Sequence, residues 1–125
     1  MNIYDKLNDL TQAIKESPEY RRYYAAAEKI SQNETWQAMV KDFLSAQIQL
    51  SAMRFMGREP DDESIGNFNN LYASISAVRE VNEFIMAQAA FSQVMTDITQ
   101  AVSKAADTGF SFMDFDPSDM TFTQQ

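Results

Sequence analysis

Two clusters of carboxylates are the residues in this sequence that could bind a metal ion. Asp61, Asp62 and Glu63 are consecutive. A second cluster near the end of the chain contains Asp114, Asp116 and Asp119. Carboxylate oxygens are the ligands that Mg²⁺ and Ca²⁺ prefer, but neither cluster has the spacing of an EF-hand loop. We interpret the first cluster as the acidic start of a helix and the second as solvated side chains, and we expect no metal site and no cofactor.

The sequence contains no His and no Cys, which removes most catalytic chemistry. A Ser-His-Asp triad, a Cys nucleophile, a zinc site with nitrogen or sulfur ligands and a disulfide all lack their residues. A di-iron bundle needs Glu-x-x-His pairs, and no glycine-rich phosphate loop is present. Acidic residues do lie on the predicted helices: Glu28, Asp42, Glu83 and Asp97. We predict that the protein is not an enzyme, and a carboxylate–metal enzyme is the least favoured alternative.

The chain is acidic, with 10 Lys and Arg against 18 Asp and Glu and a net charge of -8. This balance disfavours direct binding to nucleic acid or to an anionic membrane. The one tight basic pair, Arg21-Arg22, is expected to pair with Glu19 or Glu28 on its own helix. No apolar run reaches the roughly 20 residues that span a bilayer, and the N-terminus lacks the order of a signal peptide. We therefore expect a cytoplasmic protein.

The elements that position these side chains are helices, because apolar residues recur three and four positions apart. With 125 residues, 3 Gly and 3 Pro, the chain is predicted to be all-α. We expect a helical bundle domain over residues 1–108. Within it, Ser17 and Asn33 are predicted to cap the starts of helices and Gly57 to cap the end of one. We expect an antiparallel bundle of four to five helices that includes two long hairpin helices, near residues 34–56 and 82–106.

The predicted helix 34–56 is apolar on two sides. One stripe follows a heptad seam and contains Trp36, Met39, Phe43, Ala46, Leu50 and Met53. The other contains Val40, Leu44, Ile48 and Phe55. A helix that is apolar over more than half of its circumference must pack on two sides, within the chain or across an oligomer interface.

Two glutamines, Gln47 and Gln88, occupy seam positions of the two long helices. A seam amide costs stability unless it is paired, but it can fix register. The two side chains are expected either to bond across the helix hairpin or a dimer interface, or to lie partly exposed at the rim. We predict a protein-interaction surface that includes Trp36, Phe43, Gln47, Leu50, Met53, Phe84, Gln88 and Phe91. The alternative is that most of these side chains form the intramolecular core.

Residues 109–125 form an acidic, Phe-rich tail without Lys or Arg. Such a terminus is expected to be flexible. A more specific hypothesis is that the tail docks into a hydrophobic groove of a partner protein through Phe110, Phe112 and Phe115.

Several segments together resemble one known family. They are Ile3-Tyr4-Asp5, IKESPEYRRY over residues 14–23, MGREP over residues 56–60 and VNEFIMAQAAFSQVMTDI over residues 81–98. The chain resembles the YlbF/YmcA family of small helical regulators of competence, sporulation and biofilm formation, and within it the YheA-like branch. The resemblance covers residues 2 to 105.

This resemblance implies a helical bundle that forms homodimers or larger assemblies and has no known catalysis. It also implies partners, namely a YaaT-like protein and the endoribonuclease RNase Y, and hence a link to mRNA processing. Our leading hypothesis is a non-enzymatic regulatory or adaptor protein that acts through protein contacts. The alternative is a self-assembling structural or chaperone-like bundle without a dedicated partner.

Overall fold

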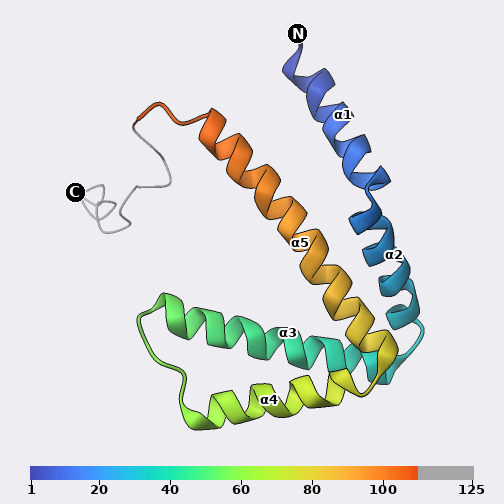
Figure 1. Ribbon diagram of the computed structural model, residues 1–125, viewed down its shortest axis with the longest axis vertical. Helices are drawn as coiled ribbons and strands as arrows, with labels where there is room; N and C mark the ends of the chain where they lie inside the picture. The colour runs from blue at the N-terminus through green and yellow to red at the C-terminus, as the bar shows by residue number, and fades with distance from the viewer. Residues whose placement is uncertain (110–125) are drawn as a thin grey trace, which may run out of the picture. The chain divides into compact units, whose positions relative to one another are not determined.

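The computed structural model describes residues 1–109, and these residues form helices joined by short turns (Figure 1). The helices are α1 (Ile3–Glu16), α2 (Pro18–Ser31), α3 (Glu34–Phe55), α4 (Asp62–Ser76) and α5 (Arg79–Ala105). No strand occurs between residues 1 and 109, so the predicted all-α helical bundle is confirmed. The two longest helices are α3, with 22 residues, and α5, with 27 residues. None of the described helices is both long and apolar enough to cross a membrane.

The chain divides into two units, the first of which is residues 1–92, and α5 runs through the boundary into the second. In the second unit the described part is the last half of α5 and the turn that follows. Gln93 donates to Asp97 Oδ1 at 2.9 Å, one helical turn further on. After the helix, Gly109 adopts a φ of 87° and its backbone N–H donates to Asp107 Oδ1 at 2.9 Å. Of the predicted tail, only Gly109 lies within the described residues.

Side-chain caps determine where the helices of the first unit begin. Ser17 Oγ accepts a hydrogen bond from the Tyr20 N–H at 3.2 Å, and Asn33 Oδ1 accepts one from the Trp36 N–H at 3.0 Å. Both predicted caps are therefore confirmed. Pro18 follows Ser17 at the first helical position, where its missing N–H costs no helical hydrogen bond.

The cap of α3 gives a first testable prediction. Replacing Asn33 by Ala should lower the free energy of unfolding by about 1 kcal/mol, because the Trp36 N–H loses its acceptor. Chemical denaturation of the variant measures this loss. Ser45→Ala, an exposed change in the middle of the same helix, is the control and should be neutral or slightly stabilising. Equal stabilities for the two variants would mean that the cap does not stabilise α3.

The turn between α3 and α4 folds these helices into an antiparallel hairpin (Figure 1). Gly57 has a φ of 77°, a conformation that favours glycine, and the next N–H, from Arg58, donates to the Met53 carbonyl at 2.8 Å. Asp61 then begins α4 by accepting from the Ser64 N–H at 2.7 Å. Gly57 therefore caps α3 as predicted, and the hairpin partner of α3 is the shorter helix α4.

The last helix begins earlier than its predicted start at Asn82. The Asn82 N–H already donates to the Val78 carbonyl at 2.9 Å, so Asn82 lies in the first turn of α5. The chain turns just before this point, where the Val78 N–H donates to the Ile75 carbonyl at 3.1 Å.

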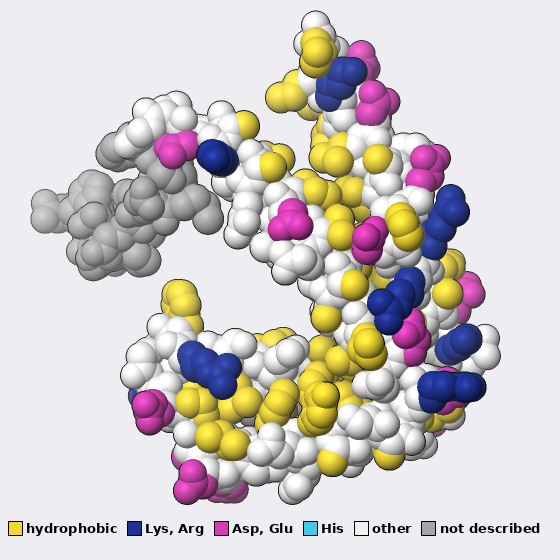
Figure 2. All heavy atoms as spheres, viewed as in Figure 1, with side chains coloured by type: hydrophobic (Ala, Val, Ile, Leu, Met, Phe, Trp, Pro, Cys, Tyr) yellow, Lys and Arg dark blue, Asp and Glu magenta, His cyan; other side chains and the backbone are white. Residues whose placement is uncertain are grey.

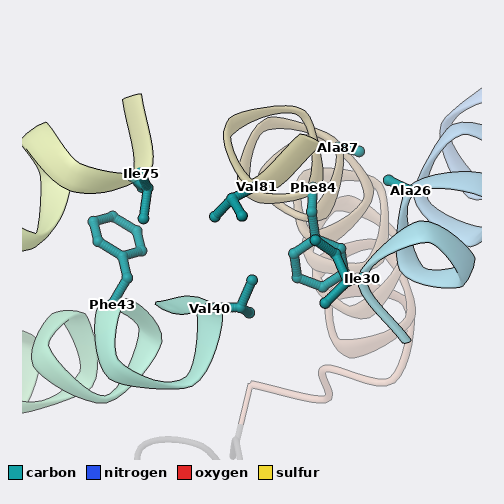
Figure 3. Close-up of a cluster of buried hydrophobic side chains, with 8 residues drawn as sticks. All are labelled: Ala26, Ile30, Val40, Phe43, Ile75, Val81, Phe84 and Ala87. Carbon is teal, nitrogen blue, oxygen red and sulfur yellow. The ribbon is translucent and has the colours of Figure 1, made fainter. Parts of the chain in front are cut away.

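The core of the first unit lies where α2, α3, α4 and the start of α5 meet (Figure 3). Its buried side chains are Ala26, Ile30, Val40, Phe43, Ile75, Val81, Phe84 and Ala87. Aromatic rings extend it on both sides. Phe43 packs on Phe68 with ring centroids 5.1 Å apart, and Tyr23 packs on Phe84 at 5.6 Å. Each of the four helices therefore contributes a small part of one continuous apolar cluster.

Candidate protein-interaction surface

Helix α3 has one buried side and one exposed apolar side. The buried side carries Val40, Phe43, Ala46 and Leu50, and it packs within the first unit. On the opposite side Ile48 is 68% exposed, and at the end of the helix Phe55 is 93% exposed and Met56 65%. Large apolar side chains exposed together mark candidate binding surfaces, whereas single ones are ordinary. This side of α3 is therefore the strongest candidate for a site of protein contact.

These side chains lie on an open, nearly flat surface of a single helix, which we call the α3 outer groove. It is lined by Gln47, Ile48, Ser51, Ala52, Phe55 and Met56. The lining is mostly apolar, and the groove is open rather than enclosed, as suits a peptide or a helix more than a small metabolite. Figure 2 shows hydrophobic, basic and acidic side chains at the end of the hairpin where α3 ends and α4 begins.

The stretch of sequence that contains the groove residues differs in charge from the rest of the chain. Residues 43–58 include Arg54 and Arg58 but no Asp or Glu, although the whole chain has a net charge of -8. Arg54 lies in the last turn of α3, and Arg58 follows the Gly57 cap. The α3 outer groove is therefore an apolar surface beside two cations on an acidic protein.

The predicted interaction residues fall into three sets by burial. Phe43, Leu50 and Phe84 are buried in the first unit. The partly buried set contains Trp36, Met53, Gln88 and Phe91, while Gln47 is exposed. The structure thus buries seven of the eight at least partly, and contact with a partner stays a prediction for all of them. Phe110, Phe112 and Phe115, predicted to dock into a partner, lie outside the described residues.

The two glutamines do not form the predicted bond across the helices of one chain. Gln88 instead donates to Ser92 Oγ on its own helix at 3.1 Å. Gln47 is exposed and lines the α3 outer groove. Of the two expectations, the structure agrees with glutamines that lie at least partly exposed, since Gln47 is exposed and Gln88 is partly buried and bonded within its own helix. A role at a dimer interface stays a prediction.

Two residues of the α3 outer groove, Ile48 and Phe55, were recognised in the sequence as a second stripe but were not included in the predicted interaction surface. A third, Met56, was assigned only to the end of the helix. The absence of carboxylates between residues 43 and 58 is the signal that could have identified this surface.

The first carboxylate cluster has a structural role. Asp61 caps α4, and the hydrogen bond from the Ser64 backbone N–H lowers the pKa of its carboxyl. Asp62 and Glu63 lie in the first turn, where the helix dipole favours negative charge. Within residues 1–109, no three acidic side chains come close enough to hold a metal ion. The second cluster, Asp114, Asp116 and Asp119, lies outside this range.

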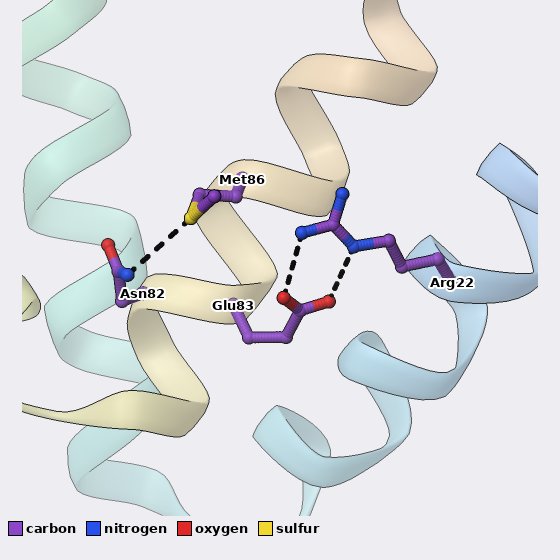
Figure 4. A network of polar contacts seen from close by, with 4 residues as sticks. All are labelled: Arg22, Asn82, Glu83 and Met86. Atoms are coloured by element: carbon purple, nitrogen blue, oxygen red, sulfur yellow. Dashed lines mark hydrogen bonds and ion pairs between the residues drawn. The ribbon is translucent and has the colours of Figure 1, made fainter.

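A salt bridge joins α2 to α5 (Figure 4). The Arg22 guanidinium donates to both carboxylate oxygens of Glu83, at 2.7 and 2.8 Å. This contact raises the pKa of Arg22 and lowers the pKa of Glu83. The predicted pairing of Arg22 with Glu19 or Glu28 was wrong, because the packing of α5 against α2 offers a carboxylate with bidentate geometry.

The lowered pKa of Glu83 predicts how stability depends on pH. A carboxyl with a lower pKa in the folded state stabilises the fold above its ordinary pKa, 4.5, and loses this contribution as the pH falls through the folded-state value. The wild type should therefore be modestly more stable than Glu83→Gln at pH 7, and the gap should close in acid. Thermal denaturation between pH 7 and pH 3 measures it. A gap that stays constant over this range would show that the ion pair is not its source.

Comparison with known proteins identifies the family of this chain. A family model described as "Control of competence regulator ComK, YlbF/YmcA" matches residues 3–106. A UPF0342 protein of Caldicellulosiruptor saccharolyticus is 32% identical over 85% of this chain and 88% of its own length. A UPF0342 protein of Symbiobacterium thermophilum is 28% identical over 88% of this chain and 98% of its own length. Because the family model covers all five helices, the chain belongs to the YlbF/YmcA family.

Proposed function

We propose that this chain is a non-enzymatic cytoplasmic regulatory or adaptor protein that works through protein–protein contacts. The observation that carries the proposal is the α3 outer groove, where Ile48, Phe55 and Met56 are exposed on one element. Leaving these side chains in water forgoes the free energy that burial in a complex would provide. Membership of a family named for competence control supports a regulatory role.

The partners we propose follow from the family resemblance. They are a second copy of this chain and, in a regulatory complex, a YaaT-like protein or RNase Y, which would link the chain to mRNA processing. The acidic net charge of -8 favours contact with proteins over direct contact with RNA.

Removing the apolar side chains from the groove tests the proposal. Ile48→Ser combined with Phe55→Ser should reduce recovery of the partner in an affinity pull-down at least tenfold, since buried aromatic and aliphatic anchors dominate interface energies. The fold should survive because both side chains are exposed. The native cytoplasm, treated with nuclease, is the source of partners, and mass spectrometry identifies them.

A matched control places the same change on another exposed surface. Ile3→Ser with Leu7→Ser removes two exposed apolar side chains from α1. It should leave partner recovery unchanged. If the α3 variant recovers the same proteins as the wild type, the groove is not the contact site and the proposal fails.

A self-assembling bundle without a dedicated partner is the second candidate. The exposed apolar side of α3 is as well suited to a second copy as to another protein. Recovery of the bait alone, at a mass above one subunit, would favour this candidate.

A further inference from the structure

The α3 outer groove and the end of the chain have complementary compositions. The groove is apolar, and two arginines are next to its last residues in the sequence: Arg54 precedes Phe55, and Arg58 follows Met56 by two positions. Residues 110–122 contain no Lys or Arg and consist largely of aromatic and acidic side chains, which are Phe110, Phe112, Phe115, Phe122, Asp114, Asp116 and Asp119. A ligand for the groove needs apolar anchors and negative charge in one short stretch, and this segment has both.

We propose that residues 110–122 of a second copy of this chain occupy the α3 outer groove. Phenylalanine side chains of the segment cover Ile48 and Phe55, and its aspartates pair with Arg54 and Arg58. When two copies exchange segments, each provides one groove and one ligand, which closes a symmetric dimer. The inference rests on the proposed function, since it names the occupant of the same groove.

The lengths of the two elements are compatible. The groove runs from Gln47 to Met56, which along a helix is about 15 Å. Thirteen residues, 110–122, can extend to roughly 45 Å, so the segment can follow the groove with chain to spare for the connection. Each buried Phe covers about 150–250 Å², so two or three of them supply the apolar area of a small interface.

Charge reversal in matched pairs provides the test, with the full chain in every sample. The groove variant carries Arg54→Glu and Arg58→Glu, and the segment variant carries Asp114→Lys and Asp116→Lys. In each variant alone, the groove and the segment of the second copy carry charges of the same sign and repel each other. Each should therefore self-associate at least tenfold more weakly than the wild type in sedimentation equilibrium. An equimolar mixture should regain wild-type affinity, because both grooves then meet segments of opposite charge.

Controls of equal charge change separate local pairing from net charge. Lys6→Glu with Lys15→Glu matches the groove variant, and Asp5→Lys with Asp9→Lys matches the segment variant, all on α1. These controls should keep the wild-type dissociation constant to within twofold. Circular dichroism should show the same helicity for all variants, since the changed residues of α1 and α3 are exposed.

Three results would overturn the inference. The first is a wild-type chain that stays monomeric at every concentration. The second is a groove or segment variant that self-associates as well as the wild type. The third is a mixture of the two variants that recovers no affinity, as expected when the segment does not cross between copies.

The proposed function survives each of these results if Ile48→Ser with Phe55→Ser still loses its partner from the pull-down. In that case the groove binds another protein and only its occupant was misassigned. If that variant keeps its partner as well, the proposed function fails too.

Discussion

Replacing Phe43 by Ala should lower the free energy of unfolding by about 3–5 kcal/mol. Phe43 is 3% exposed and packs against Phe68 and Tyr72 of the hairpin partner α4, with ring centroids 5.1 and 6.3 Å away. Truncating the ring removes apolar burial and leaves a cavity that the surrounding helices fill only partly. Urea denaturation followed by circular dichroism measures the loss.

The control for this prediction lies on the same helix. Phe55 is 93% exposed, so Phe55→Ala should change the stability by less than about 0.5 kcal/mol. The pair compares one residue type on two sides of α3. Similar losses for both variants would mean that the side of α3 assigned to the core is wrong.

The size of the loss at Phe43 also determines what a charged substitution does. A domain of this size is stabilised by about 5–15 kcal/mol in total, and a buried unpaired carboxylate costs several kcal/mol beyond the loss of the ring. Phe43→Asp should therefore abolish folding. If Phe43→Asp stayed folded and lost only self-association, Phe43 would belong to an interface rather than to the core.

The helices could be predicted from the sequence because their signals are local. The capping residues Ser17 and Asn33 lie within three residues of the N–H groups they bind, and Gly57 ends α3 through its own backbone conformation. Apolar spacing then assigned the segments between the caps to helices. The predicted start of α5, Asn82, is three residues later than the observed start, Arg79. Asn82 is a common capping residue, but the chain has already turned before it, where the Val78 N–H bonds to the Ile75 carbonyl.

The candidate site was harder to predict because it depends on which helices meet. Phe43 and Phe55 both lie on apolar stripes of one helix, and spacing gives no reason to bury one and expose the other. Only the position of α4 decides it, since α4 covers Phe43 through Phe68. The Arg22–Glu83 pair joins residues 61 positions apart, so no local pattern could indicate it.

A fully buried alanine of α5 gives the second large effect. Ala87 of α5 is 0% exposed and lies near Ala26 of α2, which is 4% exposed (Figure 3). Both alanines belong to one cluster of buried apolar side chains. Replacing Ala87 by Leu adds three carbon atoms where little space is left, so we expect a loss of about 1–3 kcal/mol in the free energy of unfolding.

The Arg22–Glu83 ion pair supplies a second readout for this variant. Glu83 lies one helical turn before Ala87, and Arg22 lies one turn before Ala26. If the larger side chain pushes α2 and α5 apart, the bidentate contact is lost and the pKa of Glu83 rises toward its ordinary value. The acid-dependent part of the stability should then shrink together with the midpoint of thermal unfolding. The control is Ala89→Leu, on the exposed side of α5, which should change neither quantity. A stable Ala87→Leu variant with an unaltered pH dependence would show that α2 and α5 do not pack tightly at Ala87.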